Sequence, residues 1–202
     1  MIRMPIPIRR LALLLAVAAG SACSAAQSQQ AAAPAPGTTT IVILARHAEK
    51  ASETETDPDL SQRGRERAAA LGRALEGARL TGGIVSERIR THQTAGPALA
   101  IHGIVPDTVS IQGGVAAHAR GVAERIRAHH AGGTVLVVGH SNTIPAIMTA
   151  LGAGPLPDIC DAAYGNLYVM ALEKDQPPAI LRTKFGAPDP EGADDCPGMR
   201  AG

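Results

Sequence analysis

The sequence predicts an α/β fold, a three-layer α/β/α sandwich built around a mostly parallel sheet. Three observations support this prediction. Short apolar runs rich in β-branched residues alternate along the chain with segments of helical character, the order that a parallel sheet requires. These runs contain few polar residues, which is typical of strands covered on both faces. Two of them end almost directly in a histidine, at His47 and at His140, and ligands of such sheets bind beyond the carboxyl ends of the strands.

The predicted strands are apolar runs bounded by glycine or by polar residues. They cover residues 40–45, 84–86, 134–138, 166–172 and 179–185. The predicted helices show apolar residues at helical spacing between loop segments. The first begins at Ser61, its expected N-cap, and the others cover 93–100, 119–130 and 144–151. Pro97 is expected in the first turns of the second helix, where its missing N–H is tolerated.

Composition excludes several function classes. The 202 residues suffice for one domain with a sizeable core and hardly for two, and a hydrophobic fraction of 45% is not that of a disordered chain. Two Tyr, one Phe and no Trp leave little material for a surface that stacks on nucleic-acid bases. Without Arg3, Arg9 and Arg10, 16 basic residues stand against 18 acidic ones, a net charge of −2. We therefore expect neither nucleic acid nor an anionic membrane as a partner.

The N-terminus has the pattern of an export signal. Its three arginines precede an apolar run that is too short to span a bilayer stably, and small residues follow. Residues 1–26 are therefore predicted to be a signal peptide. Alternatively, a lipoprotein signal ends at Ala22 and Cys23 carries a lipid, although Gly20 stands where a lipobox usually has Leu. Either route exports the protein to the periplasm or cell envelope, with a lipid on Cys23 as its only membrane attachment.

Three segments follow this signal. Residues 27–39 are rich in Ala, Pro, Gln and Thr and are predicted to be a flexible linker, residues 40–186 form the folded domain, and residues 187–202 form an irregular tail. Cys160 and Cys196 make an even number of cysteines in an oxidising compartment, which motivates the hypothesis of a disulfide that ties down the tail. Two free thiols are the alternative, because the pairing count does not establish geometry.

Four side chains are expected to meet at one edge of the sheet. Arg46 and His47 end the first strand, His140 follows a later strand, and Arg90 comes shortly after the strand between them. Arginine presents a planar fork of donors that matches pairs of phosphate oxygens, and a neutral histidine can attack through a ring nitrogen. The set predicts an anion pocket in which Arg46, Arg90 and His140 neutralise a phosphoryl group while His47 accepts it as a covalent phosphohistidine.

These residues stand in blocks that resemble the motifs of the histidine phosphatase (phosphoglycerate mutase-like) superfamily. The resembling blocks are RHAE at 46–49, DPDLSQRG at 57–64, SERIRTHQTA at 86–95 and GHSN at 139–142. Each block alone is a weak signal, whereas several in the family's order at strand ends are specific. The likeness covers about residues 41–186, so that residues 40–186 are identified as a histidine phosphatase domain.

The resemblance implies a small single-domain bacterial member with a phosphoglycerate mutase-like fold. It implies that His47 accepts the phosphoryl group, that Arg46 and Arg90 bind its oxygens and that His140 stabilises its charge, with no metal and no cofactor. It implies a phosphatase that acts on a small phosphomonoester or on phosphohistidine. Glu49 is interpreted either as a support for these residues or as an ordinary loop charge.

The general acid that protonates the leaving oxygen is not identified by the sequence. Many members of the family carry a Glu or Asp between the second and third blocks, whereas residues 110–120 contain no carboxylate. Asp107, in a predicted loop, is the tentative candidate. Glu124 stands beside arginines at helical spacing, which is typical of a surface ion pair, and His118 is another donor.

Two other functions stay open. A zinc-dependent hydrolase would use His47 and His140 as metal ligands, but the neighbouring Arg46 and Arg90 repel a cation and attract phosphate. A non-catalytic module of the cell envelope would bind phosphorylated ligands without turnover, and the missing general acid is the feature that supports it.

Overall fold

The computed structural model describes residues 39–196, and it holds one mixed six-stranded sheet. The predicted signal peptide, the lipid on Cys23 and almost all of the predicted linker lie outside the described residues. The strands are β1 (Thr40–Arg46), β2 (Gly82–Val85), β3 (Asp107–Thr108), β4 (Thr134–Gly139), β5 (Asn166–Leu172) and β6 (Ala179–Lys184). Their order across the sheet is β3-β2-β4-β1-β5-β6.

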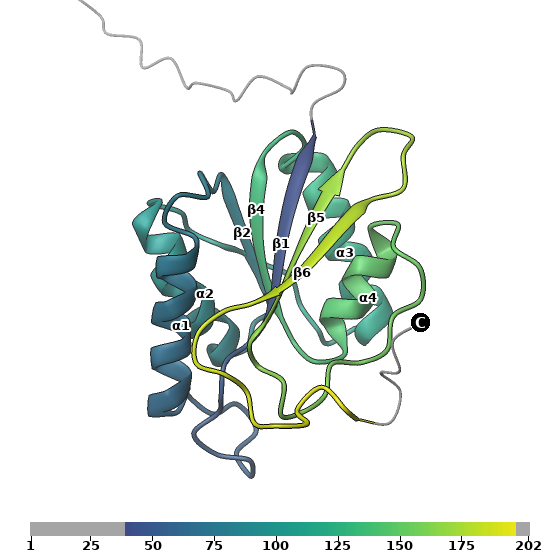
Figure 1. Ribbon diagram of the computed structural model, residues 1–202. Coiled ribbons are helices and arrows are strands. Elements are labelled where there is room, and N and C mark those ends of the chain that lie inside the picture. Colours follow the sequence, from purple (N-terminus) through teal and green to yellow (C-terminus); the bar gives the residue numbers. More distant parts are fainter. Residues whose placement is uncertain (1–38, 197–202) are drawn as a thin grey trace, which may run out of the picture. The chain divides into compact units, whose positions relative to one another are not determined.

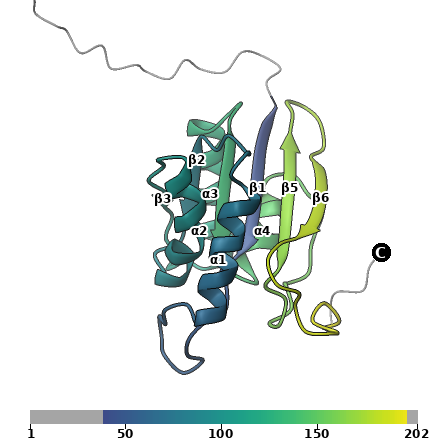
Figure 2. The ribbon, with the colours of Figure 1, turned by 60° about the vertical axis from the view of Figure 1, so that its left-hand side comes forward.

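The first four strands of that order run parallel, and the last two run antiparallel to their neighbours. One face of the sheet is covered by α1 (Gln62–Ala74) and α2 (Ile89–Ile101), and the other by α3 (Val115–His129) and α4 (Thr143–Ala150) (Figures 1 and 2). The predicted α/β/α sandwich around a mostly parallel sheet is therefore confirmed. No helix within this described part of the chain has the length and hydropathy of a membrane span.

The apolar runs form strands because both of their faces are buried. Along β1, Val42 and Leu44 face α3 and α4, while Ile43 and Ala45 face α1 and α2, and each of the four is at most 4% exposed. Successive side chains of a strand point to opposite faces, so a run without polar residues supplies two cores at once. The ends of such strands are rigid, and they carry the candidate site.

Most predicted elements are confirmed, with one clear error. Ser61 caps α1 as expected, since its side chain accepts a hydrogen bond from the backbone N–H of Gly64 at 3.0 Å. However, α2 begins at Ile89 rather than at residue 93, which places Pro97 in the helix interior. The first turn of α2 was missed because its polar residues Arg90, Thr91 and His92 give no apolar pattern, although Thr91 is fully buried. The short strand β3 was not predicted either, because residues 107–108 are not part of an apolar run.

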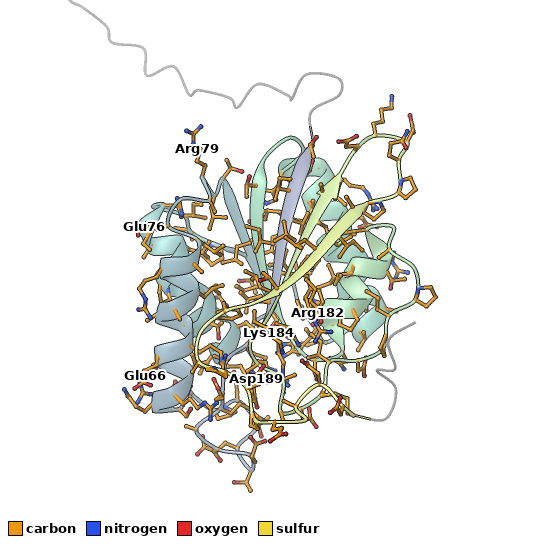
Figure 3. All side chains as sticks on the ribbon, in the orientation of Figure 1. Glu66, Glu76, Arg79, Arg182, Lys184 and Asp189 are labelled. Carbon is orange, nitrogen blue, oxygen red and sulfur yellow. A yellow bond between two sulfur atoms is a disulfide. The ribbon has the colours of Figure 1, made fainter. Side chains whose placement is uncertain are left out.

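The described part of the C-terminal tail, residues 187–196, contains no helix or strand and packs against the domain. In Figure 3, Asp189 of the tail lies beside Lys184 at the end of β6, and their charged groups are 3.2 Å apart. Asp189 also contacts the buried guanidinium of Arg67 at 3.3 Å. The predicted disulfide between Cys160 and Cys196 is present, with Cα atoms 5.6 Å apart. Residues 187–196 are thus fixed to the domain by ion pairs and by a covalent bond.

Candidate active site

The parallel strands deliver all four predicted site residues to one edge of the sheet. Arg46 ends β1 opposite Gly139 of β4, and the next residue, His47, donates its backbone N–H to the Gly139 carbonyl at 2.9 Å. His140 directly follows β4, and Arg90 lies in the first turn of α2. The four side chains line one pocket of about 400 Å³.

His47 is buried, and its ring is oriented by its own loop. Its Nδ1 atom lies 2.8 Å from the carbonyl oxygen of Ala48, which cannot donate a proton, so Nδ1 carries the hydrogen and Nε2 keeps a lone pair. Burial and, to a smaller extent, the charge of Arg46 lower the pKa of His47 to about 2, although the hydrogen bond to Ala48 acts in the opposite direction. The ring is therefore neutral at physiological pH, the state that a nitrogen nucleophile requires.

Two backbone carbonyls accept hydrogen bonds from one terminal nitrogen of Arg46. Its Nη1 donates to the carbonyls of Cys160 at 2.9 Å and of Asp161 at 2.8 Å, and its guanidinium lies 4.3 Å above the ring of Tyr164. Its Nε is buried and, within residues 39–196, has no hydrogen-bond partner. A buried donor without a partner is costly, so this edge of the guanidinium is suited to an anion in the pocket.

Arg90 repeats this arrangement with different anchors. Its Nη1 pairs with the Asp57 carboxylate at 3.2 Å, and its Nη2 lies 3.5 Å from Nδ1 of His140. Its Nε is also buried without a partner among the described residues. Both arginines are thus fixed at Nη1 and keep an Nε without a partner among the described residues, so the pocket is rich in cationic donors that suit a phosphoryl group.

His140 is positioned by a serine beneath it. Its Nε2 lies 2.9 Å from Oγ of the fully buried Ser86, and its ring centroid is 5.3 Å from that of His47. Burial, followed by the charge of Arg90, lowers the pKa of His140 to about 3. Because an arginine can only donate, Nδ1 of His140 accepts from Arg90, and Nε2 carries the hydrogen that is donated to Ser86.

The loop after β1 is supported from outside the pocket, and Glu49 is part of that support. Its carboxylate contacts the guanidinium of Arg67 at 2.8 Å and that of Arg63 at 3.1 Å. The backbone N–H of Ala48 donates to Oγ1 of Thr94 on α2 at 2.9 Å. Of the two interpretations of Glu49, support of the site fits these contacts.

The three candidates for a general acid do not join the four residues. Asp107 pairs with His130 at 3.4 Å and with Arg125 at 3.8 Å, at the opposite end of α3 from the pocket. Glu124 is exposed on α3. His118 is buried, with Nδ1 at 3.2 Å from the carbonyl oxygen of Ser110, and does not line the pocket.

The structure adds site residues that the sequence did not suggest. Asp161 is the one carboxylate among the residues that line the pocket, and its side chain is 98% exposed. Tyr164, beneath Arg46, comes from the same segment before β5, for which no motif exists. Asp57 and Ser86, by contrast, lie within the motif blocks, so the resemblance could have marked them as partners of Arg90 and His140.

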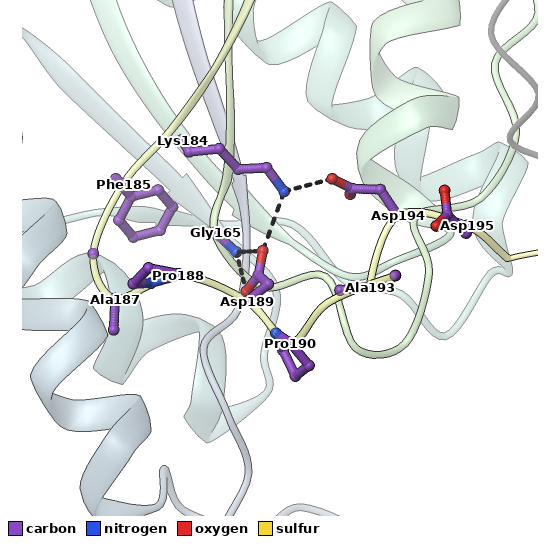
Figure 4. Close-up of a pocket in the computed structure, with 12 residues that line it drawn as sticks. Gly165, Lys184, Phe185, Ala187, Pro188, Asp189, Pro190, Ala193, Asp194 and Asp195 are labelled. Carbon is purple, nitrogen blue, oxygen red and sulfur yellow. Dashed lines mark hydrogen bonds and ion pairs between the residues drawn. The ribbon is translucent and has the colours of Figure 1, made fainter.

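A larger cavity of about 580 Å³ lies at the tail, away from the four residues (Figure 4). The ionic groups labelled there are largely paired with one another: Lys184 bridges Asp189 and Asp194, and Asp189 accepts from the backbone N–H of Gly165. The smaller pocket is the candidate active site, because unsatisfied cationic donors converge there. Across residues 39–196, no group of three His, Cys, Asp or Glu side chains is arranged to hold a metal ion.

In a comparison with known protein families, one family model matches part of this chain. The model of the histidine phosphatase superfamily, branch 1, matches residues 42–111, which contain Arg46, His47 and Arg90. No curated protein matches the sequence significantly.

Solved structures share the fold. A putative phosphohistidine phosphatase SixA from Nakamurella multipartitia is 26% identical, covers 76% of this chain and 100% of its own, and superposes with a TM-score of 0.54. A protein histidine phosphatase SixA complexed with tungstate is 16% identical over 71% of this chain and 96% of its own, with a TM-score of 0.56. A mycobacterial glucosyl-3-phosphoglycerate phosphatase with inorganic phosphate is 17% identical over 73% and 97%, with a TM-score of 0.55.

Proposed function

We propose that this chain, which belongs to the histidine phosphatase superfamily and is a phosphatase, hydrolyses small phosphomonoesters or phosphohistidine through a covalent phosphohistidine on His47. The observation that carries the proposal is the pairing of a neutral, buried His47 with two arginines whose buried Nε donors lack protein partners in residues 39–196.

The first step would be attack of the His47 Nε2 lone pair on phosphorus. A nitrogen–phosphorus bond forms as the bond from phosphorus to the leaving group breaks, and the electron pair of that bond goes to the leaving group. Arg46 and Arg90 neutralise the charge on the phosphoryl oxygens through their Nε edges. His140 positions Arg90 for this role, because its Nδ1 accepts from Nη2 of that arginine while its Nε2 donates to Ser86.

In the second step, water attacks the phosphohistidine. An oxygen–phosphorus bond forms, the nitrogen–phosphorus bond breaks, and inorganic phosphate leaves while His47 regains its neutral ring. Splitting the transfer in this way replaces one difficult displacement by two easier ones. The solved structures of similar fold in complex with tungstate and with inorganic phosphate support binding of a tetrahedral oxyanion.

The pocket favours leaving groups that depart without a strong enzyme acid. Asp161 is the one carboxylate among the described residues that line the pocket, and its exposed side chain lies 3.6 Å from the guanidinium of Arg46 instead of being held toward a leaving group. Imidazole of phosphohistidine and phenolate of aryl phosphates fit this condition better than simple alkoxides do. The SixA relative that is 26% identical supports the phosphohistidine branch of the proposal.

Phosphate release from a panel of phosphohistidine, aryl and alkyl phosphates tests this function, with His47→Ala as the control. We expect turnover of the first two classes, little turnover of alkyl phosphates, and none in the variant. Activity that a chelator removes and zinc restores would favour the metal hydrolase instead. A wild type that binds phosphate without turning over any member of the panel would favour the non-catalytic envelope module.

We also propose that the protein is exported to the periplasm or cell envelope. The disulfide between Cys160 and Cys196 supports this location, because such bonds persist in oxidising compartments. Cell fractionation together with the mass of the mature N-terminus tests it. Cleavage after Ala26 would indicate a soluble envelope protein, a lipid on Cys23 would indicate a lipoprotein, and an intact Met1 in the cytosol would contradict export.

A further inference from the structure

The segment between α4 and β5 orients Arg46 although it has neither helix nor strand. The two N–H groups of Nη1 of Arg46 both donate to this segment, to the carbonyl of Cys160 at 2.9 Å and to that of Asp161 at 2.8 Å. Hydrogen bonds from a charged donor are short and directional, so the position of these carbonyls sets the plane of the guanidinium. That plane decides whether the free Nε edge of Arg46 meets a phosphoryl oxygen.

The first half of this segment has few contacts, since residues 154–158 are exposed, and Asp161 is exposed as well. Ile159 is buried and donates its backbone N–H to the carbonyl of Ser141 at 2.9 Å. The carbonyl of Cys160 also accepts from the backbone N–H of the buried Ala163 at 2.9 Å. The covalent tie is at Cys160 itself, which is buried and bonded to Cys196 of the tail.

The tail that carries Cys196 is itself anchored next to the same arginine. Asp189 accepts from the backbone N–H groups of Tyr164 at 3.1 Å and Gly165 at 3.0 Å, and the ring of Tyr164 lies under Arg46. Figure 4 shows Asp189 between Gly165 and Lys184. The tail thus reaches the surroundings of Arg46 at two points, once through the disulfide and once through Asp189.

We propose that the Cys160–Cys196 disulfide positions Arg46, so that the affinity of the active site for a phosphoryl group depends on whether this bond is intact. Cys160 and Cys196 are positioning residues, since neither needs to touch the substrate. The proposal rests on the proposed function in one respect, that Arg46 binds phosphoryl oxygens.

Reduction opens the bond with a balanced exchange. A dithiol gives two electrons and two protons, the sulfur–sulfur bond of Cys160 and Cys196 breaks to two thiols, and the dithiol becomes a cyclic disulfide. The tail then stays attached only through its ion pairs and backbone hydrogen bonds. The carbonyls of Cys160 and Asp161 gain freedom, and the guanidinium of Arg46 loses its fixed plane.

The test measures inorganic phosphate binding by calorimetry, together with the KM and kcat for an aryl phosphate, in the full mature chain. The oxidised wild type is compared with the dithiol-treated protein and with a Cys160→Ser/Cys196→Ser double variant. We expect phosphate to bind about tenfold more weakly without the disulfide, equal to about 1.4 kcal/mol. KM should rise by a similar factor, while kcat changes less than threefold.

Two further backgrounds separate positioning from general loosening. In an Arg46→Lys background the serine pair should change phosphate affinity less than twofold, because the fork that the carbonyls orient is gone. In an Arg90→Lys background the tenfold loss should persist, because Asp57 rather than the tail anchors that arginine. Leu75→Ala, a core truncation at the far end of α1, should lower the melting temperature without changing phosphate affinity.

Equal phosphate affinity of the oxidised, reduced and serine proteins would overturn the proposal and leave the disulfide a purely structural crosslink. A tenfold loss that is the same in the Arg46→Lys background would also overturn it, since Arg46 would not be the group through which the bond acts. If the oxidised wild type neither binds phosphate nor turns over the aryl ester, the proposed function fails, and this proposal fails with it.

Discussion

Replacing Arg67 by methionine removes the cation that joins the loop after β1 to the C-terminal tail. The Arg67 side chain is 1% exposed, and its guanidinium contacts the carboxylates of Glu49 at 2.8 Å and Asp189 at 3.3 Å. It also donates to the carbonyl oxygens of Phe185, just after β6, and of Ala187 in the tail. In the variant, two carboxylates that are 14% and 5% exposed lose their buried partner.

Removing one member of a buried ion pair typically costs about 3–5 kcal/mol. Arg63 still faces Glu49 and Lys184 still faces Asp189, so we expect the lower end, about 3 kcal/mol, or roughly 10 °C in melting temperature. Arg63→Ala is the matched control, because it removes a contact of 3.1 Å to the same carboxylate from a side chain that is 51% exposed. Such an exposed pair is worth less than about 1 kcal/mol.

Urea denaturation followed by circular dichroism measures both variants against the wild type. We expect a clear fall in the midpoint for Arg67→Met and almost none for Arg63→Ala. The kcat/KM of Arg67→Met should also fall, because Glu49 lies only two residues after His47. Equal stability losses in the two variants, or a loss below about 1 kcal/mol for Arg67→Met, would refute the assignment of Arg67 as the central support of this loop.

Three further predictions concern the pocket. The pKa values of His47 and His140, about 2 and about 3, lie below the value of 6.5 of an unburied histidine, so below pH 6.5 the unfolded chain binds more protons than the folded one. As the pH falls from 6.5 to about 4, the free energy of unfolding should therefore fall by up to about 1.4 kcal/mol per pH unit for each histidine. Urea titrations measure this slope, and His140→Gln should roughly halve it. Asp57→Ala frees Nη1 of Arg90 and should raise KM for an aryl phosphate about fivefold with kcat nearly constant; an unchanged KM would show that Arg90 needs no anchor. Ser86→Ala removes the partner of Nε2 of His140 and should lower kcat about tenfold, whereas wild-type kcat would mean that the ring is oriented without it.

The strand ends were predictable because the relevant physics is local. An apolar run without polar residues has to be covered on both faces, and its end therefore lies at an edge of the sheet, so the positions of Arg46, His47 and His140 followed from pattern alone. The position of Arg90 could be predicted only after the strand that precedes it in the sequence had been recognised. The first turn of α2 was missed because its residues are mostly polar and give no apolar pattern, although Thr91 is fully buried and Arg90 lines the pocket.

The anchors of Arg46 could not be predicted, because they are backbone carbonyls more than a hundred residues away in sequence. A carbonyl carries no side-chain signal, and the segment before β5 has no motif. The disulfide was hypothesised from the even number of cysteines, but its proximity to Arg46 depends on how the tail folds back. The carboxylate that lines the pocket could not be predicted either: Asp161 reaches it by long-range folding, while Asp107, the tentative candidate, pairs with His130.

Trapping the phosphoenzyme tests the central claim most directly. The wild type is mixed with an aryl phosphate, quenched in base and digested, and the modified peptide is located by mass spectrometry. We expect one phosphoryl group on the His47 ring, stable in base, lost in acid, and absent from His47→Ala. A phosphoryl group on any other residue, or turnover by His47→Ala at the wild-type rate, would contradict the account.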